Sequence, residues 1–178
     1  MPSIISKKIC MLGDFNVGKT SLIRRFVERQ FSDQYLSTIG VKISRKNVEC
    51  QSADGQKQII VQMLLWDLEG NTKFKTITPM YLQGASAAVI VADVNRQVTI
   101  EHILDHVQCF LSVNPKGSII VALNKSDLFD ENKLVEVLEA VSFKLPEQVI
   151  ASYSTSAKTG AQVDQIFQRL AYQIIKPE

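Results

Sequence analysis

The sequence lacks the features that would place the chain in a membrane, in a secretory pathway or on a nucleic acid. Its longest mainly apolar stretch, Ala85–Ala92, is far shorter than the roughly 20 residues that a membrane span needs. Its first residues do not form a signal peptide. The net charge is only +2, and the densest basic stretch is the short Lys42–Lys46. We therefore expect a cytoplasmic protein that binds no nucleic acid and has no transmembrane segment.

Cysteine is also scarce. Cys10, Cys50 and Cys109 are far apart and have apolar neighbours, which predicts buried reduced thiols rather than a disulfide framework or a zinc site. The chain ends in Ile-Ile-Lys-Pro-Glu, without the terminal cysteine of a prenylation signal. We expect no lipidation site in this chain, and membrane association only through a missing tail or a partner.

The apolar pattern predicts one α/β domain over residues 1–178. Apolar runs alternate with helical patterns, which is typical of a mostly parallel sheet with helices on both faces. The pair Asp54-Gly55 indicates an early hairpin and hence one antiparallel strand. The six strands are expected at Lys8–Gly13, Val41–Cys50, Gln58–Asp67, Ala87–Ala92, Ser118–Leu123 and Val149–Ser154. Helices are expected at Lys19–Gln30, Val98–Val113, Glu131–Val141 and Ala161–Ile175.

The segment Gly13–Thr20 matches the phosphate-loop pattern of Gly, four residues and Gly-Lys-Thr, and it lies between a strand and a helix. Inward-facing backbone N–H groups and the helix N-terminus form an anion site there. Lys19 is expected to reach the outer phosphates and the Thr20 hydroxyl to bind Mg²⁺. A glycine-rich helix cap would leave the Lys19-Thr20 pair unexplained. The nucleotide-binding residues expected in this segment are Asn16, Val17, Gly18, Lys19, Thr20 and Ser21.

The tetrapeptide Asn124-Lys125-Ser126-Asp127 directly follows a strand, at the edge where open α/β sheets bind ligands. A carboxylate at Asp127 can accept both N–H groups on the edge of guanine, and adenine lacks that donor pair. Asn124, Lys125 and Asp127 are therefore expected to bind a guanine base. A simple helix cap is the alternative. A P-loop ATPase or kinase is disfavoured by Asp127.

Two further motifs follow strands. In Thr155-Ser156-Ala157-Lys158, a backbone N–H of Ser156 or Ala157 is expected to contact the guanine oxygen, with Lys158 packing across the ring. Asp67 is placed to hold a magnesium-bound water. Gly70 offers its N–H to the last phosphate. Standing alone, Asp67 would be better interpreted as a turn carboxylate.

These motifs occur in an order that resembles the Ras superfamily of small GTPases, most closely its Rab branch, from about Lys7 to Ile175. The resemblance implies a P-loop G domain that switches between GTP and GDP and hydrolyses GTP by attack of water on the γ-phosphate. It implies that Thr38 binds Mg²⁺ in the GTP state. It further implies that Phe31 stacks on guanine and that Tyr35 closes over the phosphates. The catalytic set so implied is Lys19, Thr38, Gly70 and Asn71. Both a eukaryotic Rab without its tail and a bacterial Rab-like protein are consistent with the sequence.

The resemblance also implies protein partners. Effectors and regulators are expected to contact Thr38–Ile43, Trp66 and Gly70–Tyr81 of a monomer. For Trp66 and Tyr81, ordinary core packing is the alternative.

Three residues depart from the family pattern. Asn71 stands where the water-orienting glutamine is usual, and it is one methylene shorter. Glu69 replaces a small residue and should disfavour the closed switch unless it points away. Phe15 is bulky where a small residue is normal, whereas Asn16 tolerates a positive φ. We therefore expect slow hydrolysis, or alternatively a GTP-binding interaction module with little or none. His102 and His106, four apart, are expected to be exposed helix residues.

Overall fold

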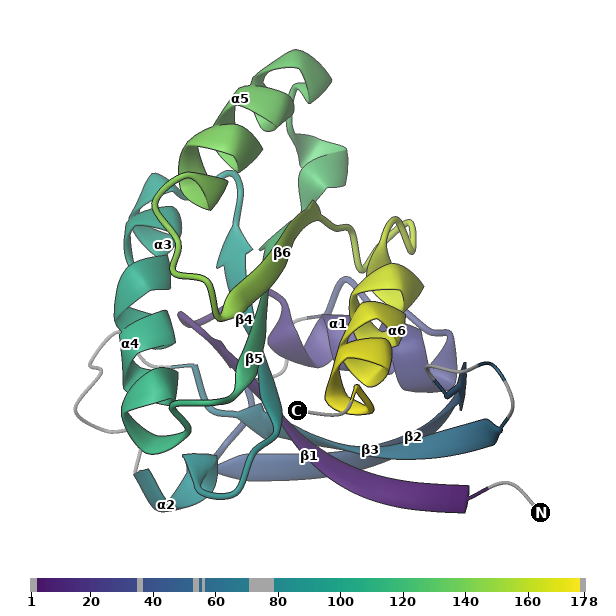
Figure 1. The fold of residues 1–178 in the computed structure, drawn as a ribbon. Helices are drawn as coiled ribbons and strands as arrows, with labels where there is room; N and C mark the ends of the chain where they lie inside the picture. Colours follow the sequence, from purple (N-terminus) through teal and green to yellow (C-terminus); the bar gives the residue numbers. More distant parts are fainter. Residues whose placement is uncertain (1–2, 35–36, 53–54, 56, 71–78, 177–178) are drawn as a thin grey trace.

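The computed structural model describes residues 3–34, 37–52, 55, 57–70 and 79–176, and these residues form a single six-stranded sheet with flanking helices (Figure 1). The strand order is β2-β3-β1-β4-β5-β6, with β2 antiparallel to β3 and every other pair parallel. This confirms the predicted fold class. The strands are β1 Ser3–Gly13, β2 Val41–Gln51, β3 Gln58–Leu68, β4 Ala87–Asp93, β5 Ser118–Asn124 and β6 Val149–Ser154.

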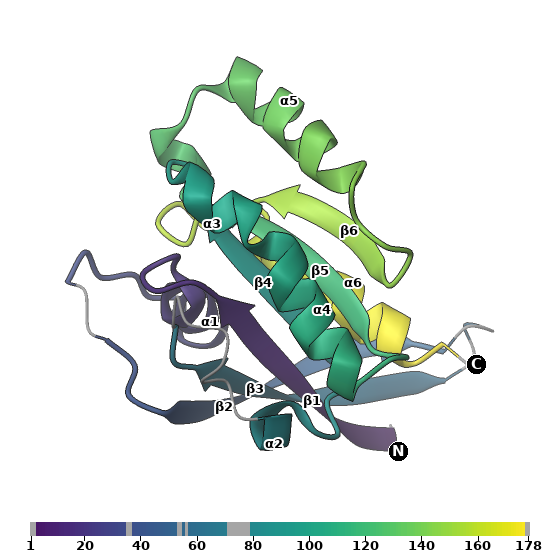
Figure 2. The same ribbon diagram turned by 90° about the vertical axis from the view of Figure 1, so that its left-hand side faces the viewer.

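Helices cover both faces of the sheet: α1 and α6 lie on one face, and α3 and α4 on the other (Figures 1 and 2). Two hydrophobic clusters form the core, and alternate residues of β1 pack into different ones. Ile9 and Met11 belong to one cluster, and Cys10 and Leu12 belong to the other. No helix among the described residues is long and apolar enough to cross a membrane. The helical elements are α1 Lys19–Glu28, α2 Pro79–Leu82, α3 Gln97–Glu101, α4 Ile103–Val113, η2 Ser126–Leu128, α5 Glu131–Ser142 and α6 Val163–Ile174.

Several boundaries differ from the sequence-based expectation. The helix expected over Val98–Val113 is divided at His102 into α3 and α4. The first helix ends at Glu28 because Arg29 adopts the left-handed conformation, with φ 59°, and caps it. Strand β1 begins at Ser3 rather than Lys8, because its first residues pair with β3. The short elements α2 and η2 were not predicted.

The cysteines are largely as predicted. Cys10 and Cys50 are buried, Cys109 is half-buried, and all three are free thiols. Burial raises the pKa of the Cys10 thiol to about 12. Cys10 is therefore protonated at neutral pH and behaves as a small apolar core residue.

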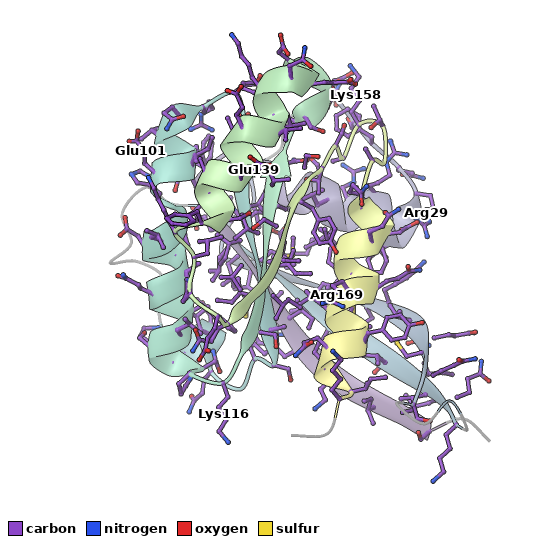
Figure 3. All side chains as sticks on the ribbon, turned by 45° about the horizontal axis from the view of Figure 1, so that its top comes forward. Arg29, Glu101, Lys116, Glu139, Lys158 and Arg169 are labelled. Carbon is purple, nitrogen blue, oxygen red and sulfur yellow. The ribbon has the colours of Figure 1, made fainter. Side chains whose placement is uncertain are left out.

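The parallel strands end at one edge of the sheet, and the candidate motifs follow those ends. Lys158, in the loop after β6, lies at this edge, whereas Lys116, in the loop before β5, lies at the opposite end of the molecule (Figure 3). The parallel arrangement thus brings segments from across the chain to one place.

Candidate functional site

A cleft of about 340 Å³ opens at the carboxyl edge of the sheet. Among the predicted site residues that the structure describes, Val17, Ser156 and Asp67 are buried behind the cleft and the others line it. Tyr35 and Asn71 lie outside the described residues. The resemblance places the first switch at Ser37–Val41 and the second at Trp66–Ala85, and residues 71–78 of the second also lie outside the described residues. The predicted residues that line the cleft are Asn16, Gly18, Lys19, Thr20, Ser21, Phe31, Thr38, Gly70, Asn124, Lys125, Asp127, Ala157 and Lys158.

The loop between β1 and α1 is held from outside by its carbonyl oxygens. Arg96 Nη1 donates to Phe15 O at 2.8 Å, Lys125 Nζ donates to Asn16 O at 2.8 Å, and Asn124 Nδ2 donates to Val17 O at 3.0 Å. In a trans peptide the N–H points opposite to the C=O. The N–H groups that follow these carbonyls therefore face the other way, as an anion nest requires. Asn16 has the positive φ, 60°, that its residue type tolerates.

Lys19 is the first residue of α1, and its buried side chain reaches back to the beginning of this loop. Its Nζ donates to Gly13 O at 2.9 Å and to Asp14 O at 2.7 Å. Burial lowers the pKa of Lys19 to about 8, against the opposing effect of Asp67 and Asp14. Gly70 approaches the same point: a Cβ there would lie 2.5 Å from Lys19 Nζ and 2.7 Å from Asp14 O. Only glycine allows this close approach.

Three oxygen-bearing side chains converge beside Lys19. Thr20 Oγ1 donates to Asp67 Oδ2 at 2.6 Å. Thr38 Oγ1 lies 2.8 Å from Thr20 Oγ1 and donates to the same Asp67 oxygen at 3.4 Å. Asp67 Oδ1 is buried and has no hydrogen-bond partner among the described residues. Burial raises the pKa of Asp67 above its ordinary value, although both threonine hydroxyls act in the opposite direction. Hydroxyl and carboxylate oxygens are the ligands that Mg²⁺ prefers, so the donor set fits that ion.

The two strand-end motifs after β5 and β6 contact each other. Asn124 Oδ1 accepts from Thr155 Oγ1 and from the Ala157 N–H, each at 3.3 Å. Ser156 Oγ donates to Asp127 Oδ1 at 2.6 Å, while Asp127 itself is exposed at the cleft. Lys125 Nζ is 2.8 Å from Asp93 Oδ2, which joins the end of β4 to the same group.

Arg25 of α1 supports the loop after β6. Its Nε donates to Ala157 O at 2.7 Å, and its Nη2 donates to Lys158 O. Sequence reasoning missed this residue because the contact joins positions 132 apart. A half-buried arginine on the first helix carries no motif that would have indicated this contact.

The expected partner surface has exposed apolar side chains on the described residues. Ile39 is 87% exposed, Ile43 49% and Tyr81 39%. Trp66 is half-buried: it packs against the core, and Lys8 Nζ lies 3.8 Å above its ring. Trp66 therefore packs largely against the core, as the alternative interpretation expected, whereas the Tyr81 side chain is exposed at the surface.

The structure bears on the expectations for Glu69 and for the two histidines, and it contradicts the second. The Glu69 carboxylate is directed at the main chain of Gly40, accepting its N–H at 3.2 Å, while the Glu69 N–H donates to Gly40 O at 2.9 Å. Glu69 thus joins the two expected switches through this contact, and the effect of its charge on the closed switch stays a prediction. His102 and His106 are not exposed helix histidines: His106 is 1% exposed, and both bind the Asp14 carboxylate. The i, i+4 spacing was visible, but their partner, 88 and 92 residues away, was not.

A phosphate loop after β1 and further motifs at the ends of β3, β5 and β6 define the class of P-loop nucleotide-binding proteins. A family model described as the Ras family matches residues 8–176, and the chain belongs to that family. It is 35% identical over 168 residues to RABF2b of Arabidopsis thaliana, covering 94% of this chain and 80% of that protein. It is 32% identical over 168 residues to the GTP-binding protein ypt5 of Schizosaccharomyces pombe, covering 94% and 77%. Human Rab-22A is 31% identical over 169 residues, covering 94% and 82%.

These similarities make the chain a Rab-like member of the Ras superfamily. Proteins of this family bind guanine nucleotides and act as GTPase switches.

Proposed function

We propose that the chain is a single G domain that acts as a GTP/GDP switch with slow Mg²⁺-dependent hydrolysis. The observation that carries the proposal is that the phosphate loop, Gly70 and the motifs after β5 and β6 line one cleft, with Asp67 directly behind it. Lys19 and the N–H groups of residues 16–18 would hold the phosphates. Asp127, Ala157 and Lys158 would bind guanine, and Phe31 would stack on it.

Thr20, Thr38 and Asp67 would hold magnesium, directly or through a water, which when bound neutralises phosphate charge. Lys19 places its own cation beside the developing negative charge. The N–H of Gly70 would position the γ-phosphate, and Asn71 would orient the water. Asn71 has the amide of the usual glutamine on a shorter side chain, so we expect slow turnover.

A GTP-binding interaction module with little hydrolysis is the second candidate. It is favoured by the contact between Glu69 and Gly40, because hydrogen bonds between protein atoms there join the two expected switches. Phe15, which is 45% exposed at the cleft, would also obstruct an activating protein's arginine. In both cases effectors and regulators would contact a cytoplasmic monomer through Thr38–Ile43, Trp66 and Gly70–Tyr81.

The test measures GDP and GTP affinity and single-turnover GTP hydrolysis. Asp127→Asn should weaken GTP binding by at least about a hundredfold, because it replaces one acceptor of the two guanine N–H groups with a donor. Unchanged GTP affinity in that variant would refute the assignment of the base. Asn71→Gln should speed hydrolysis if the chain is a weakened enzyme. No gain in rate, with binding intact, favours the interaction module.

A further inference from the structure

The Asp14 carboxylate belongs to the phosphate loop yet is directed at the helices behind it. Asp14 is 1% exposed. His102 Nδ1 lies 2.7 Å from its Oδ2, and His106 Nε2 lies 2.9 Å from its Oδ1. Because a carboxylate only accepts hydrogen bonds, both ring nitrogens must donate. The two oxygens are thus held separately, which fixes the rotation of the side chain as well as its place.

We propose that His102 and His106 are positioning residues for nucleotide binding, which keep the Asp14 carboxylate turned away from the phosphates and thereby fix the first half of the phosphate loop. The proposal rests on the function proposed above.

The electrostatic reason is simple. A buried carboxylate in a loop that receives a polyphosphate repels its ligand, and low local dielectric strengthens that repulsion. With both oxygens engaged on the helix side, the negative charge is held on the far side of the main chain. Without the two histidines, both Asp14 oxygens would lose the donors that hold them on the helix side.

The structural reason is that the main chain of Asp14 serves the site directly. Its carbonyl accepts from Lys19 Nζ at 2.7 Å, and the next carbonyl, of Phe15, accepts from Arg96. Arg96 immediately precedes α3. The Asp14 side chain is therefore fixed to His102 and His106, and the Phe15 carbonyl is fixed to Arg96 just before the same two helices. The carbonyls of residues 16 and 17 are fixed separately, to Lys125 and Asn124. Loss of the histidines would release only the first of these two halves.

The experiment measures GDP affinity and dissociation in Mg²⁺ at neutral pH, with unfolding measured separately. His106→Leu and His102→Leu should each weaken GDP binding by about tenfold, the effect of one lost charge-assisted hydrogen bond. His106→Gln and His102→Asn, which retain a donor near Nε2 and Nδ1 respectively, should remain within about threefold of the parent. Phe110→Leu, a buried residue further along α4, is the control: it should lower stability and leave affinity unchanged.

A second arm separates positioning from packing. In an Asp14→Asn background the leucine substitutions should cost less than about twofold, because a neutral amide no longer repels the phosphates. Equal losses in both backgrounds would indicate packing alone and overturn the inference, as would parent-like affinity of both leucine variants. If His106→Leu does not fold, the test uses His102→Leu alone, because His102 is partly exposed. The loss of GDP affinity that it causes is then compared between the parent and the Asp14→Asn background. Failure of the parent itself to bind GDP would instead overturn the proposed function.

Discussion

Glu69 lies where the two expected switch segments, Ser37–Val41 and Trp66–Ala85, meet. Its carboxylate accepts the Gly40 N–H and its own N–H donates to Gly40 O, so this pair extends the β2–β3 ladder by one step beyond Val41 and Leu68. A small residue at position 69 would retain the main-chain bond and lose the side-chain bond. Glu69 thus adds a side-chain hydrogen bond between the two segments to the one that the main chain supplies.

We predict that Glu69→Ala makes the first switch more dependent on the nucleotide. The Gly40 amide should exchange with solvent faster in the GDP state, by about threefold to tenfold, because one hydrogen bond is lost. Hydrogen exchange in the GDP state and in the state loaded with a non-hydrolysable GTP analogue provides the measurement. Glu49→Ala is the matched control, since Glu49 accepts a side-chain bond from Gln58 elsewhere on the hairpin. Equal exchange at Gly40 in parent and Glu69→Ala would contradict the prediction.

At the scale of elements, α1 joins the two ends of the site. It begins at Lys19 in the phosphate loop, and one turn and a half further on Arg25 donates to the carbonyls of Ala157 and Lys158. The helix is also packed on α6 by Phe26, whose ring stacks on Phe167 with centroids 4.1 Å apart. The phosphate loop and the loop after β6 are therefore set at a fixed separation by one rigid helix.

Arg25→Ala should accelerate GDP dissociation by about tenfold or more, because two hydrogen bonds from a charged group to the base loop are lost. Arg29→Ala, on the same helix, removes an exposed ion pair to Asp164 and should change dissociation by less than about twofold. Stopped-flow release of a fluorescent GDP analogue measures both rates. Similar rates for the two variants would show that the hydrogen bonds from Arg25 to the loop after β6 do not slow GDP dissociation.

Much of this arrangement was predictable, and the limits have physical causes. Four strands were found as short, mainly apolar runs, and the β2–β3 pair was found from the Asp54-Gly55 turn signal between two extended segments. The strand-end motifs were found because parallel strands end at one edge of the sheet. The contacts of Asp14 and Arg25 were not found, because they depend on the rotation of a helix about its axis and on partners far along the chain. The contact between Asp14 and the two histidines was harder still to predict, because an unbroken helix was expected over Val98–Val113 and the helix is interrupted at His102.

At the scale of the whole molecule, His106 makes stability depend on pH. Burial lowers the pKa of His106 below its ordinary 6.5, with Lys19 and His102 acting in the same direction and Asp14 opposing them. The unfolded chain therefore takes up a proton first as the pH falls below about 6.5, and the folded state loses stability. The raised pKa of Asp67 acts with the opposite sign at lower pH.

We predict that the free energy of unfolding falls more steeply below pH 6.5 in the parent than in His106→Gln, by up to about 1.4 kcal/mol per pH unit. Urea unfolding of the nucleotide-free protein between pH 5 and 8 measures the difference. Asp67 is present in both proteins, so its contribution cancels in the comparison. Parallel pH profiles would show that His106 does not titrate differently in the folded state.

The hydrogen bonds from Arg96, Lys125 and Asn124 to the carbonyls of the phosphate loop should affect how fast a nucleotide binds. A loop that is ordered by the protein's own side chains loses little further conformational freedom when the nucleotide arrives. Encounter then leads to binding with little rearrangement, so association should be fast and nearly the same for the diphosphate and the triphosphate. The lifetime of the nucleotide-bound state is consequently governed by nucleotide dissociation. A cellular partner that alters this lifetime must weaken these hydrogen bonds, because the site is already ordered without it.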